Sequence, residues 1–340
     1  MWAPFPGPRF MVQATPMSTE MDRRLVLEFV RVTEAAAIAC SSLIGSGEKD
    51  KADALAVQAM RAAFDRVPIH GTVVIGEGER DEAPMLYIGE EVGPKREDLP
   101  EVDIAVDPLE GTNLCAHGSP GALAVMAVAG RGCLLAAPDT YMEKIATGPE
   151  GHGVVSLKKS PTENVRGLAD AKGCRVGDIG VTVLERDRHT DLIAELREVG
   201  ARVFLIGDGD VAPAVATCRP DSGIDMVYGT GGAPEGVLAA AAMHCLGGCF
   251  KGRLRFRNDG ERERAIKMGM ADPDAYLELD DLVRGEVVFV ATGVTTGALL
   301  KGVRRDGNRL HLQTLAMRSS TGTVRYVESS IRTDRFEAHI

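Results

Sequence analysis

The sequence predicts an α/β fold, built as one large domain or as two closely packed ones. Its 340 residues, of which 44% are hydrophobic and 26% charged, are enough to bury a large core. In the second half of the chain, short apolar runs typical of strands alternate with longer runs of helical period. Such alternation is typical of folds in which helices cover the faces of sheets.

Two helices are expected first, at 22–44 and 50–64, where apolar residues recur with helical period. Apolar, β-branched runs then predict strands at 72–75, 102–107 and 122–129. The second half continues in the same way, with strands expected at 181–184, 202–206, 224–228 and 287–292 and helices at 188–199, 211–218 and 234–245.

The glycine-rich segment 148–153 is the expected junction between two halves of the chain. The halves would comprise residues 21–150 and 151–335, followed by a short tail at 336–340. Residues 1–20 are rich in Pro and Met and have no periodicity, so we expect an unstructured extension without a secretory signal.

Composition limits the possible partners and the compartment. A formal net charge of −10 disfavours nucleic acid and anionic membranes as partners, and the basic run 251–257 is soon balanced by acids. Seven scattered cysteines, an odd number, indicate packing thiols in a reducing cytoplasm. The chain lacks an apolar stretch of about 18 residues, so no membrane span is expected.

The segment 101–113 is a strand that ends in two acids three positions apart, Asp107 and Glu110. Pro108 between them is expected to stop the strand ladder and to turn Glu110 back beside Asp107. Such oxygen ligands suit Mg²⁺ or Mn²⁺, while Gly111 and Thr112 offer an N–H and a hydroxyl to a phosphate or to water. Alone, the segment is also compatible with a simple acidic turn.

Three further segments carry acids next to glycines. Between Gly76 and Glu82 four acids crowd into six positions, which favours either a bound cation or a solvated loop. In the turn at 45–53, Asp50 or Asp53 is a candidate cap of the following helix. Near 224–236 a strand and a glycine turn lead to a helix beginning near Pro234, where Glu235 suits either a metal or the helix dipole.

In this order the segments resemble the class II fructose-1,6-bisphosphatase family, within the lithium-sensitive, metal-dependent phosphatase superfamily. The resemblance runs from about residue 21 to about residue 335 and includes residues 76–93 and the Asp-Pro-x-Glu-Gly-Thr element. It implies a layered α-β-α-β-α sandwich of the sugar phosphatase type. It also implies hydrolysis of the 1-phosphate of fructose-1,6-bisphosphate to fructose 6-phosphate, in gluconeogenesis or the reductive pentose phosphate cycle.

The resemblance assigns metal binding to the N-terminal half and substrate binding to the C-terminal half. It implies Mn²⁺ or Mg²⁺ as cofactor, with Asp53, Glu77, Asp107, Glu110 and Glu235 as ligands. Thr112 and Asp81 would orient and deprotonate the attacking water. The implied substrate contacts are Glu110, Gly111, Thr112, Tyr141, Arg186, Asp187, Arg188, Asp208, Gly209, Asp210 and Gly232, with Arg188 as the main ligand of the second phosphate. Asp187, between two arginines, departs from the family pattern.

Three functional hypotheses remain at this stage. The first is a sugar bisphosphatase, and some relatives also hydrolyse sedoheptulose-1,7-bisphosphate. The second is an inositol or nucleotide monophosphatase of the same superfamily, and the third is a non-catalytic protein that binds metal or phosphate. We also expect a homo-oligomer, either a dimer or a tetramer.

Overall fold

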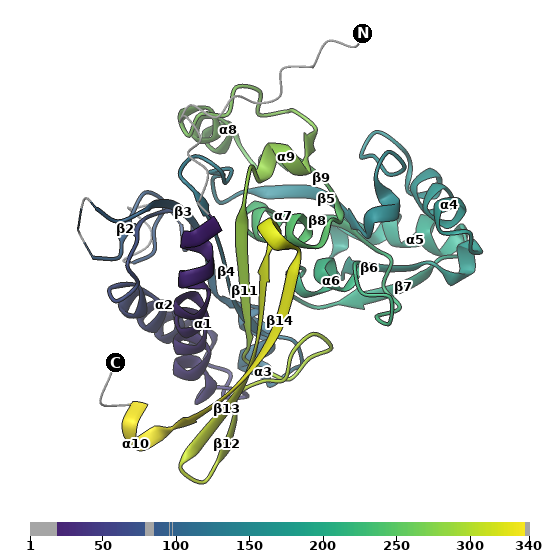
Figure 1. Ribbon diagram of the computed structural model, residues 1–340. Helices are drawn as coiled ribbons and strands as arrows, with labels where there is room; N and C mark the ends of the chain where they lie inside the picture. Colours follow the sequence, from purple (N-terminus) through teal and green to yellow (C-terminus); the bar gives the residue numbers. More distant parts are fainter. Residues whose placement is uncertain (1–18, 79–84, 95, 97, 337–340) are drawn as a thin grey trace.

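The computed structural model describes residues 19–78, 85–94, 96 and 98–336 (Figure 1). Within these residues the strands form two mixed sheets, and the first has the order β12-β13-β11-β4-β3-β1-β2, with β14 paired to β13. Its strands are β1 (His70–Ile75), β2 (Glu91–Val92), β3 (Glu101–Glu110), β4 (Leu123–Gly130), β11 (Val287–Gly293), β12 (Arg304–Asp306), β13 (Arg309–Arg318) and β14 (Thr323–Arg332).

The second sheet has the order β10-β9-β5-β8-β6-β7. Its strands are β5 (Tyr141–Thr147), β6 (Gly180–Leu184), β7 (Arg202–Ile206), β8 (Met226–Gly232), β9 (Cys249–Arg255) and β10 (Leu277–Glu278). The helices are α1 (Thr19–Ser41), α2 (Lys49–Phe64), α3 (Thr112–His117), α4 (Pro161–Lys172), α5 (Thr190–Glu198), α6 (Val211–Ala216), α7 (Ala233–Leu246), α8 (Asp259–Lys267), α9 (Leu279–Leu282) and α10 (Thr333–Phe336). None of the helices in the described residues combines the length and the apolar character needed to cross a bilayer.

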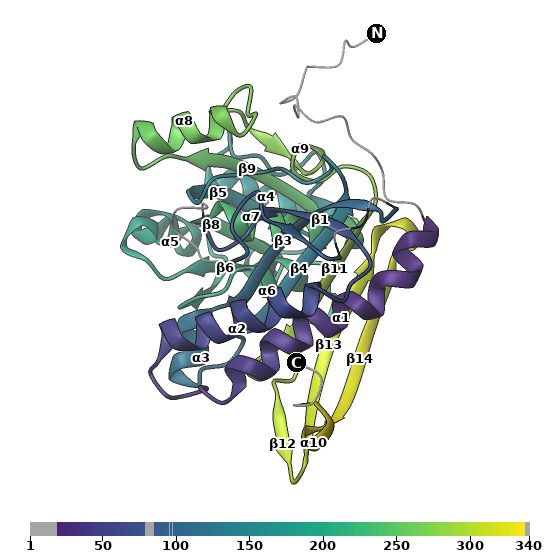
Figure 2. The same cartoon turned by 90° about the vertical axis from the view of Figure 1, so that its left-hand side faces the viewer.

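Helices α1 and α2 lie side by side over one face of the first sheet (Figure 2). Phe29 of α1 and Met60 of α2 are buried in one cluster with Ile104 of β3 and Val290 of β11. The apolar stripes predicted for these two helices therefore face the sheet.

Helix α7 lies between the two sheets and is buried on nearly all sides. Val237 of α7 shares a cluster with Phe289 of the first sheet and with Met142 of the second. Phe289 and Val290 are consecutive in β11 and face opposite layers, as the period of a strand requires. The small side chains of this alanine-rich helix leave room for a sheet on each side.

Helices α4 and α5 cover the outer face of the second sheet, where Leu168 and Leu196 pack with Ile145 and Val181. The order of layers is helices, sheet, helix, sheet and helices, so the α-β-α-β-α sandwich expected from the sequence is confirmed.

The two sheets share the chain differently from the two halves expected from the sequence. Strand β5, which precedes residue 148, already belongs to the second sheet, while β11 to β14 return to the first. The return is visible in Figure 1, where the yellow C-terminal strands lie beside the blue N-terminal elements. Each sheet is therefore completed by segments far apart in the chain.

Pro108 does not end its strand, so this prediction was wrong. β3 continues to Glu110, and the pairing with β4 is only irregular between Asp107 and Glu110. The missing N–H of Pro108 falls inside that irregularity, where the regular ladder is already interrupted. The Oδ1 atom of Asp107 accepts a hydrogen bond from the backbone N–H of Leu109 at 3.1 Å, which stabilises the local bend.

Candidate active site

A cavity of about 400 Å³ brings together acids that are far apart in the sequence. Asp53 comes from the second turn of α2, Glu77 follows β1, Asp107 lies near the end of β3, and Glu235 lies in the first turn of α7. Neither Asp50 nor Asp53 caps α2, because the helix begins at Lys49 with Glu48 at its N-cap, and both acids lie inside it. Thr112, Gly111, Tyr141, Asp208 and Gly232 of the sequence predictions also line the cavity.

Two glycines position these groups. A side chain on Gly76 would place its Cβ only 1.9 Å from the carbonyl oxygen of Leu86, so Gly76 allows the close backbone approach that places Glu77. Gly111 has φ 82°, and it redirects the chain from β3 into α3 so that Thr112 reaches the cavity.

Burial and mutual repulsion raise the pKa values of the cavity acids. Burial raises the pKa of Glu77 to about 8, with smaller upward contributions from Asp53 and Glu235. Burial, followed by repulsion from Glu77 and Glu235, also raises the pKa of Asp107 well above its usual range. These carboxylates act on one another, so a cation among them would stabilise their charged forms.

Glu110 is buried beside this cavity and not in its wall. Its Oε1 atom accepts a hydrogen bond from the backbone N–H of Val211 at 3.1 Å, while Oε2 has no hydrogen-bond partner among the described residues. Burial and the nearby Asp210 raise the pKa of Glu110 to about 8. A buried carboxylate oxygen without a donor is an atom to which a cation could bind.

The donor set therefore fits a hard divalent cation in its chemistry, since all five candidate ligands are carboxylates. Within the described part of the chain, however, no three acidic, histidine or cysteine side chains are close enough together to form a ready metal-ligand group. Four of these acids share the cavity, Glu110 lies beside it, and their charges repel one another without a ready metal-ligand group among the described residues. Asp81, expected to act on water, lies outside the described residues.

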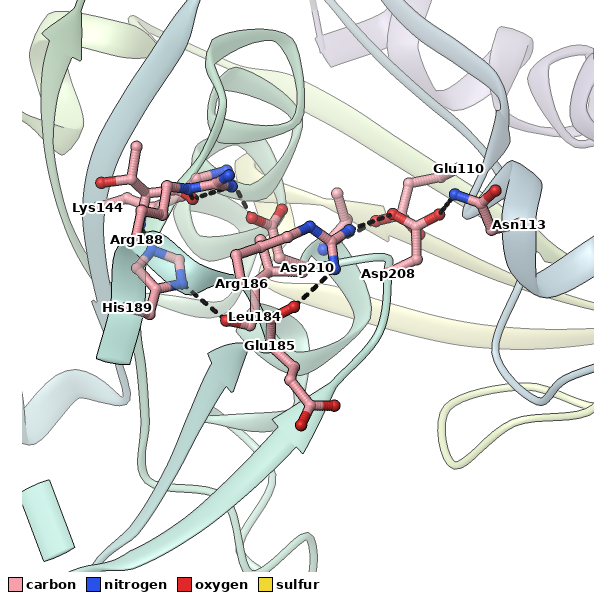
Figure 3. A network of polar contacts seen from close by, with 12 residues as sticks. Glu110, Asn113, Lys144, Leu184, Glu185, Arg186, Arg188, His189, Asp208 and Asp210 are labelled. Carbon is pink, nitrogen blue, oxygen red and sulfur yellow. Dashed lines mark hydrogen bonds and ion pairs between the residues drawn. The ribbon is translucent and has the colours of Figure 1, made fainter. Parts of the chain in front are cut away.

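The turn that carries Arg188 is fixed to strand β8 (Figure 3). Arg188 donates from Nε and Nη2 to the carbonyl oxygen of Thr230, at 3.1 and 2.8 Å. Nε2 of His189 accepts a hydrogen bond from the backbone N–H of Thr230 at 2.8 Å. The other ring nitrogen, Nδ1, therefore carries the proton and donates to the carbonyl oxygen of Leu184. The guanidinium of Arg188 also lies 4.8 Å from the ring centroid of Tyr141.

Other predicted substrate contacts surround this turn. Asp208 accepts a hydrogen bond from Asn113 at 3.0 Å, and Arg186 approaches its other carboxylate oxygen at 4.0 Å. Gly209 follows Asp208 in the same loop, while Asp187 is exposed at the start of the turn and does not line the cavity. Figure 3 shows the side chains of Asn113, Asp208 and Arg186 pointing toward one another from different segments of the chain.

A buried ion pair joins Lys144 of β5 to Asp210, with 2.8 Å between Nζ and Oδ2. Nζ of Lys144 also donates to the carbonyl oxygen of Gly232 at 2.9 Å, at the residue that precedes α7. Burial raises the pKa of Glu235, and the Lys144 ammonium opposes that rise. Lys144 thus orients two predicted substrate-contacting residues and supplies positive charge next to an acid of the cavity.

Replacing Lys144 with methionine should lower the free energy of unfolding by about 3–5 kcal/mol, because Asp210 would remain buried without its partner. Chemical denaturation would measure the loss. Lys51→Met, which breaks the exposed ion pair with Glu48, is the matched control and should cost less than about 1 kcal/mol. An equal, small cost for both variants would contradict the role assigned to Lys144.

Comparison with known proteins shows the family of this chain. Residues 23–331 match the family described as "Bacterial fructose-1,6-bisphosphatase, glpX-encoded". The chain belongs to this family. "Fructose-1,6-bisphosphatase 1 class 2" of Escherichia coli K12 is 47% identical over 329 residues, which cover 93% of this chain and 97% of that protein. Family membership confirms the expected enzyme class, a phosphoric monoester hydrolase of the class 2 fructose-1,6-bisphosphatase type.

Two further similarities are of different strength. A "D-fructose 1,6-bisphosphatase class 2/sedoheptulose 1,7-bisphosphatase" of Thermosynechococcus vestitus is 45% identical over 333 residues, which cover 91% of this chain and 96% of that protein. The structure of the extragenic suppressor protein suhB from Bartonella henselae matches 57% of this chain and 72% of that chain, with 18% identity and a TM-score of 0.30. A likeness at that TM-score carries no conclusion about function.

The structure adds residues to the site of this fructose-1,6-bisphosphatase family member that the sequence patterns did not indicate. Asp139, Thr140 and Arg257 line the cavity, and Lys144 lies behind it. Lys144 had no local signal, because it lies in β5, a strand of mixed polarity that the sequence patterns did not indicate. Arg257 belongs to the basic run 251–257, and the acids that follow this run offset its charge, so the sequence did not single out Arg257.

Proposed function

We propose that the protein hydrolyses the 1-phosphate of fructose-1,6-bisphosphate, giving fructose 6-phosphate and phosphate, in gluconeogenesis or the reductive pentose phosphate cycle. The supporting observation is the convergence of Asp53, Glu77, Asp107 and Glu235 on one cavity that also contains Thr112. Phosphate monoesters are hydrolysed very slowly in water, so a catalyst must both activate water and neutralise developing charge. A cavity lined by acids from four distant segments suits that task when a cation is bound.

Mn²⁺ or Mg²⁺ would be held by Asp53, Glu77, Asp107, Glu110 and Glu235. When bound, such ions lower the pKa of water and neutralise the attacking and leaving oxygens. The unpartnered Oε2 of Glu110 and the raised pKa values of Glu77 and Asp107 support this assignment.

The chain's own groups would perform the remaining tasks. The Thr112 hydroxyl orients the attacking water, and Asp81 takes its proton. The bare backbone at Gly111 lets a phosphate oxygen approach. Glu110, Gly111 and Thr112 line the scissile phosphate.

The other end of the substrate lies against the second sheet. Tyr141, with Arg186 to Arg188, receives the phosphate that is kept, since the planar fork of an arginine suits a phosphate. The side chains of Asp208 and Asp210, with the backbone of Gly209 and Gly232, contact the sugar hydroxyls.

A substrate panel assayed with each cation tests the proposal. With Mn²⁺ or Mg²⁺, phosphate release from fructose-1,6-bisphosphate should exceed release from inositol 1-phosphate or a nucleoside monophosphate by at least about 100-fold in kcat/KM, because a second phosphate adds charge-assisted contacts. Faster turnover of a monophosphate would favour the inositol or nucleotide monophosphatase alternative. No turnover on any substrate would favour a binding protein.

Dual activity is the finer question within the same panel. Sedoheptulose-1,7-bisphosphate should also be hydrolysed, and the support is the dual name of the Thermosynechococcus relative. We further propose a cytoplasmic homo-oligomer, a dimer or a tetramer. The seven free thiols and the edge strand β14, with Val324 and Tyr326 exposed, support this part of the proposal.

A further inference from the structure

Arg257 is the one cationic side chain that lines the carboxylate cavity among the described residues. Six acids line the same cavity: Asp53, Glu77, Asp107, Asp139, Asp208 and Glu235. Arg257 follows β9, at the end of the basic run 251–257. A single arginine at such a site is suited to bind an anion that the acids would otherwise repel.

The guanidinium of Arg257 lies near the predicted phosphate-binding tyrosine. It is 5.5 Å from the ring centroid of Tyr141, and the guanidinium of Arg188 is 4.8 Å from the same centroid. The two arginines come from distant segments, and Tyr141 brings their positive charges to one place. Of the two, Arg257 is the one found in the wall of the cavity.

The protein fixes one edge of this guanidinium and leaves the other edge open. Glu261 contacts Nε of Arg257 and accepts the Arg257 backbone N–H at 2.8 Å. Glu261 is itself buried and accepts the Thr140 hydroxyl at 2.6 Å. Nη2 of Arg257 donates to the carbonyl oxygen of Asp139 at 3.1 Å, whereas Nη1 donates no hydrogen bond within the described residues. The guanidinium of Arg257 is therefore held in position while its Nη1 group keeps N–H donors for a ligand, as a preorganised anion-binding group requires.

The neighbouring arginines of the run are engaged elsewhere. Arg255 pairs with Glu143, and Arg253 stacks on Tyr276 at 4.8 Å. Neither of them lines the carboxylate cavity. Position 257 therefore differs from the rest of the run in its surroundings, not in its charge.

We propose that Arg257 binds the phosphate that the substrate keeps, together with Tyr141 and Arg188, and so determines the preference for bisphosphates over monophosphates. This inference rests on the proposed function. A sugar bisphosphate carries two dianionic groups, one of which lies among the metal-binding acids during the reaction. The other needs fixed positive charge, and Arg257 supplies it in the wall of the cavity, held by Glu261 and by the carbonyl of Asp139.

Kinetics of Arg257→Gln with two substrates test the proposal. Fructose 1-phosphate lacks the phosphate that Arg257 would bind, so the ratio of kcat/KM for fructose-1,6-bisphosphate to that for fructose 1-phosphate should fall about 10- to 100-fold. The loss should appear in KM more than in kcat, because the contact is made equally in the ground and transition states. Arg257→Lys, which keeps the charge and loses the fork, should recover part of the ratio.

Arg255→Gln is the matched control, since it removes an arginine two positions away that points to Glu143, and it should leave the ratio unchanged. Fructose 6-phosphate binding, measured by calorimetry without metal, provides a readout independent of turnover and should weaken about 10-fold or more in Arg257→Gln. Equal losses on both sugars would show a merely structural role, and unchanged fructose 6-phosphate binding would also overturn the proposal. If the wild-type protein hydrolysed no bisphosphate, the proposed function would fail, while the calorimetric titration would still decide the role of Arg257.

Discussion

Replacing Asp107 with asparagine should lower kcat for fructose-1,6-bisphosphate by about 10²- to 10³-fold, the usual cost of losing one charge-stabilising group in an active site. Asparagine keeps the shape of the side chain and loses its negative charge. Asp107 is the acid on which Glu77, Glu235, Glu110 and Asp53 all act, so it holds the central position in the field of the cavity. Steady-state kinetics at saturating Mn²⁺ or Mg²⁺ would measure the change.

The same substitution should stabilise the metal-free protein. The asparagine side chain would be neutral at every pH, so the repulsion that raises the pKa values of the neighbouring acids would fall. We therefore expect a higher Tm for Asp107→Asn than for the wild type in the presence of a chelator. Opposite changes in activity and stability are typical of residues placed for function.

Asp103→Asn is the matched control on the same strand. Asp103 accepts backbone hydrogen bonds from Cys133 at 2.9 Å and from Leu134 at 3.2 Å, away from the cavity. Its replacement should lower Tm and leave kcat within about threefold, since a lost hydrogen bond affects stability and not the charge of the site. If Asp107→Asn behaved like Asp103→Asn, the catalytic assignment of Asp107 would be wrong.

The parts of the fold that the sequence predicted are those whose signal is local. The helical period of α1, α2 and α7 and the apolar runs of β3, β4 and β11 are contained in short windows, and the structure places each of these elements close to its expected position. The longer strands β5, β9, β13 and β14 were missed. Their side chains are mixed in polarity, so an apolar run does not mark them. β5 is placed by pairing with β8 and β9, which are distant in sequence, whereas β13 and β14 pair with each other as neighbours in the chain.

The residues of the candidate site also divide into those with a local sequence signal and those without one. Asp107 and Glu235, which line the cavity, could be proposed from the sequence because each lies next to a turn or a helix start with its own chemical signature. Arg257 could not be distinguished from Arg253 and Arg255 by sequence, because its role depends on Glu261 and Tyr141, and the tyrosine lies more than a hundred positions away. Residues that act through tertiary contacts leave little local pattern to recognise.

Removing divalent cations should abolish turnover and expose a pH dependence of stability that the loaded protein lacks. In the metal-free protein, Glu77 and Glu110 have pKa values of about 8, compared with the ordinary value of 4.5. Between these values the folded protein binds more protons than the unfolded chain, so stability falls as pH rises through the window. Near pH 8 each acid is about half ionised, and the loss approaches completion about one pH unit higher.

Thermal unfolding with EDTA between pH 5 and pH 8.5 measures this effect, and Tm should fall by at least about 5 °C across the range. Adding Mn²⁺ or Mg²⁺ should restore Tm mainly at the alkaline end, because a cation binds the ionised carboxylates and competes with protons for them. Glu77→Gln removes one titrating group and should flatten the metal-free curve, whereas Glu48→Gln, an exposed acid outside the cavity, should not. A metal-free Tm that rose with pH, or a cation effect equal at both ends, would mean that these acids do not form the cation site.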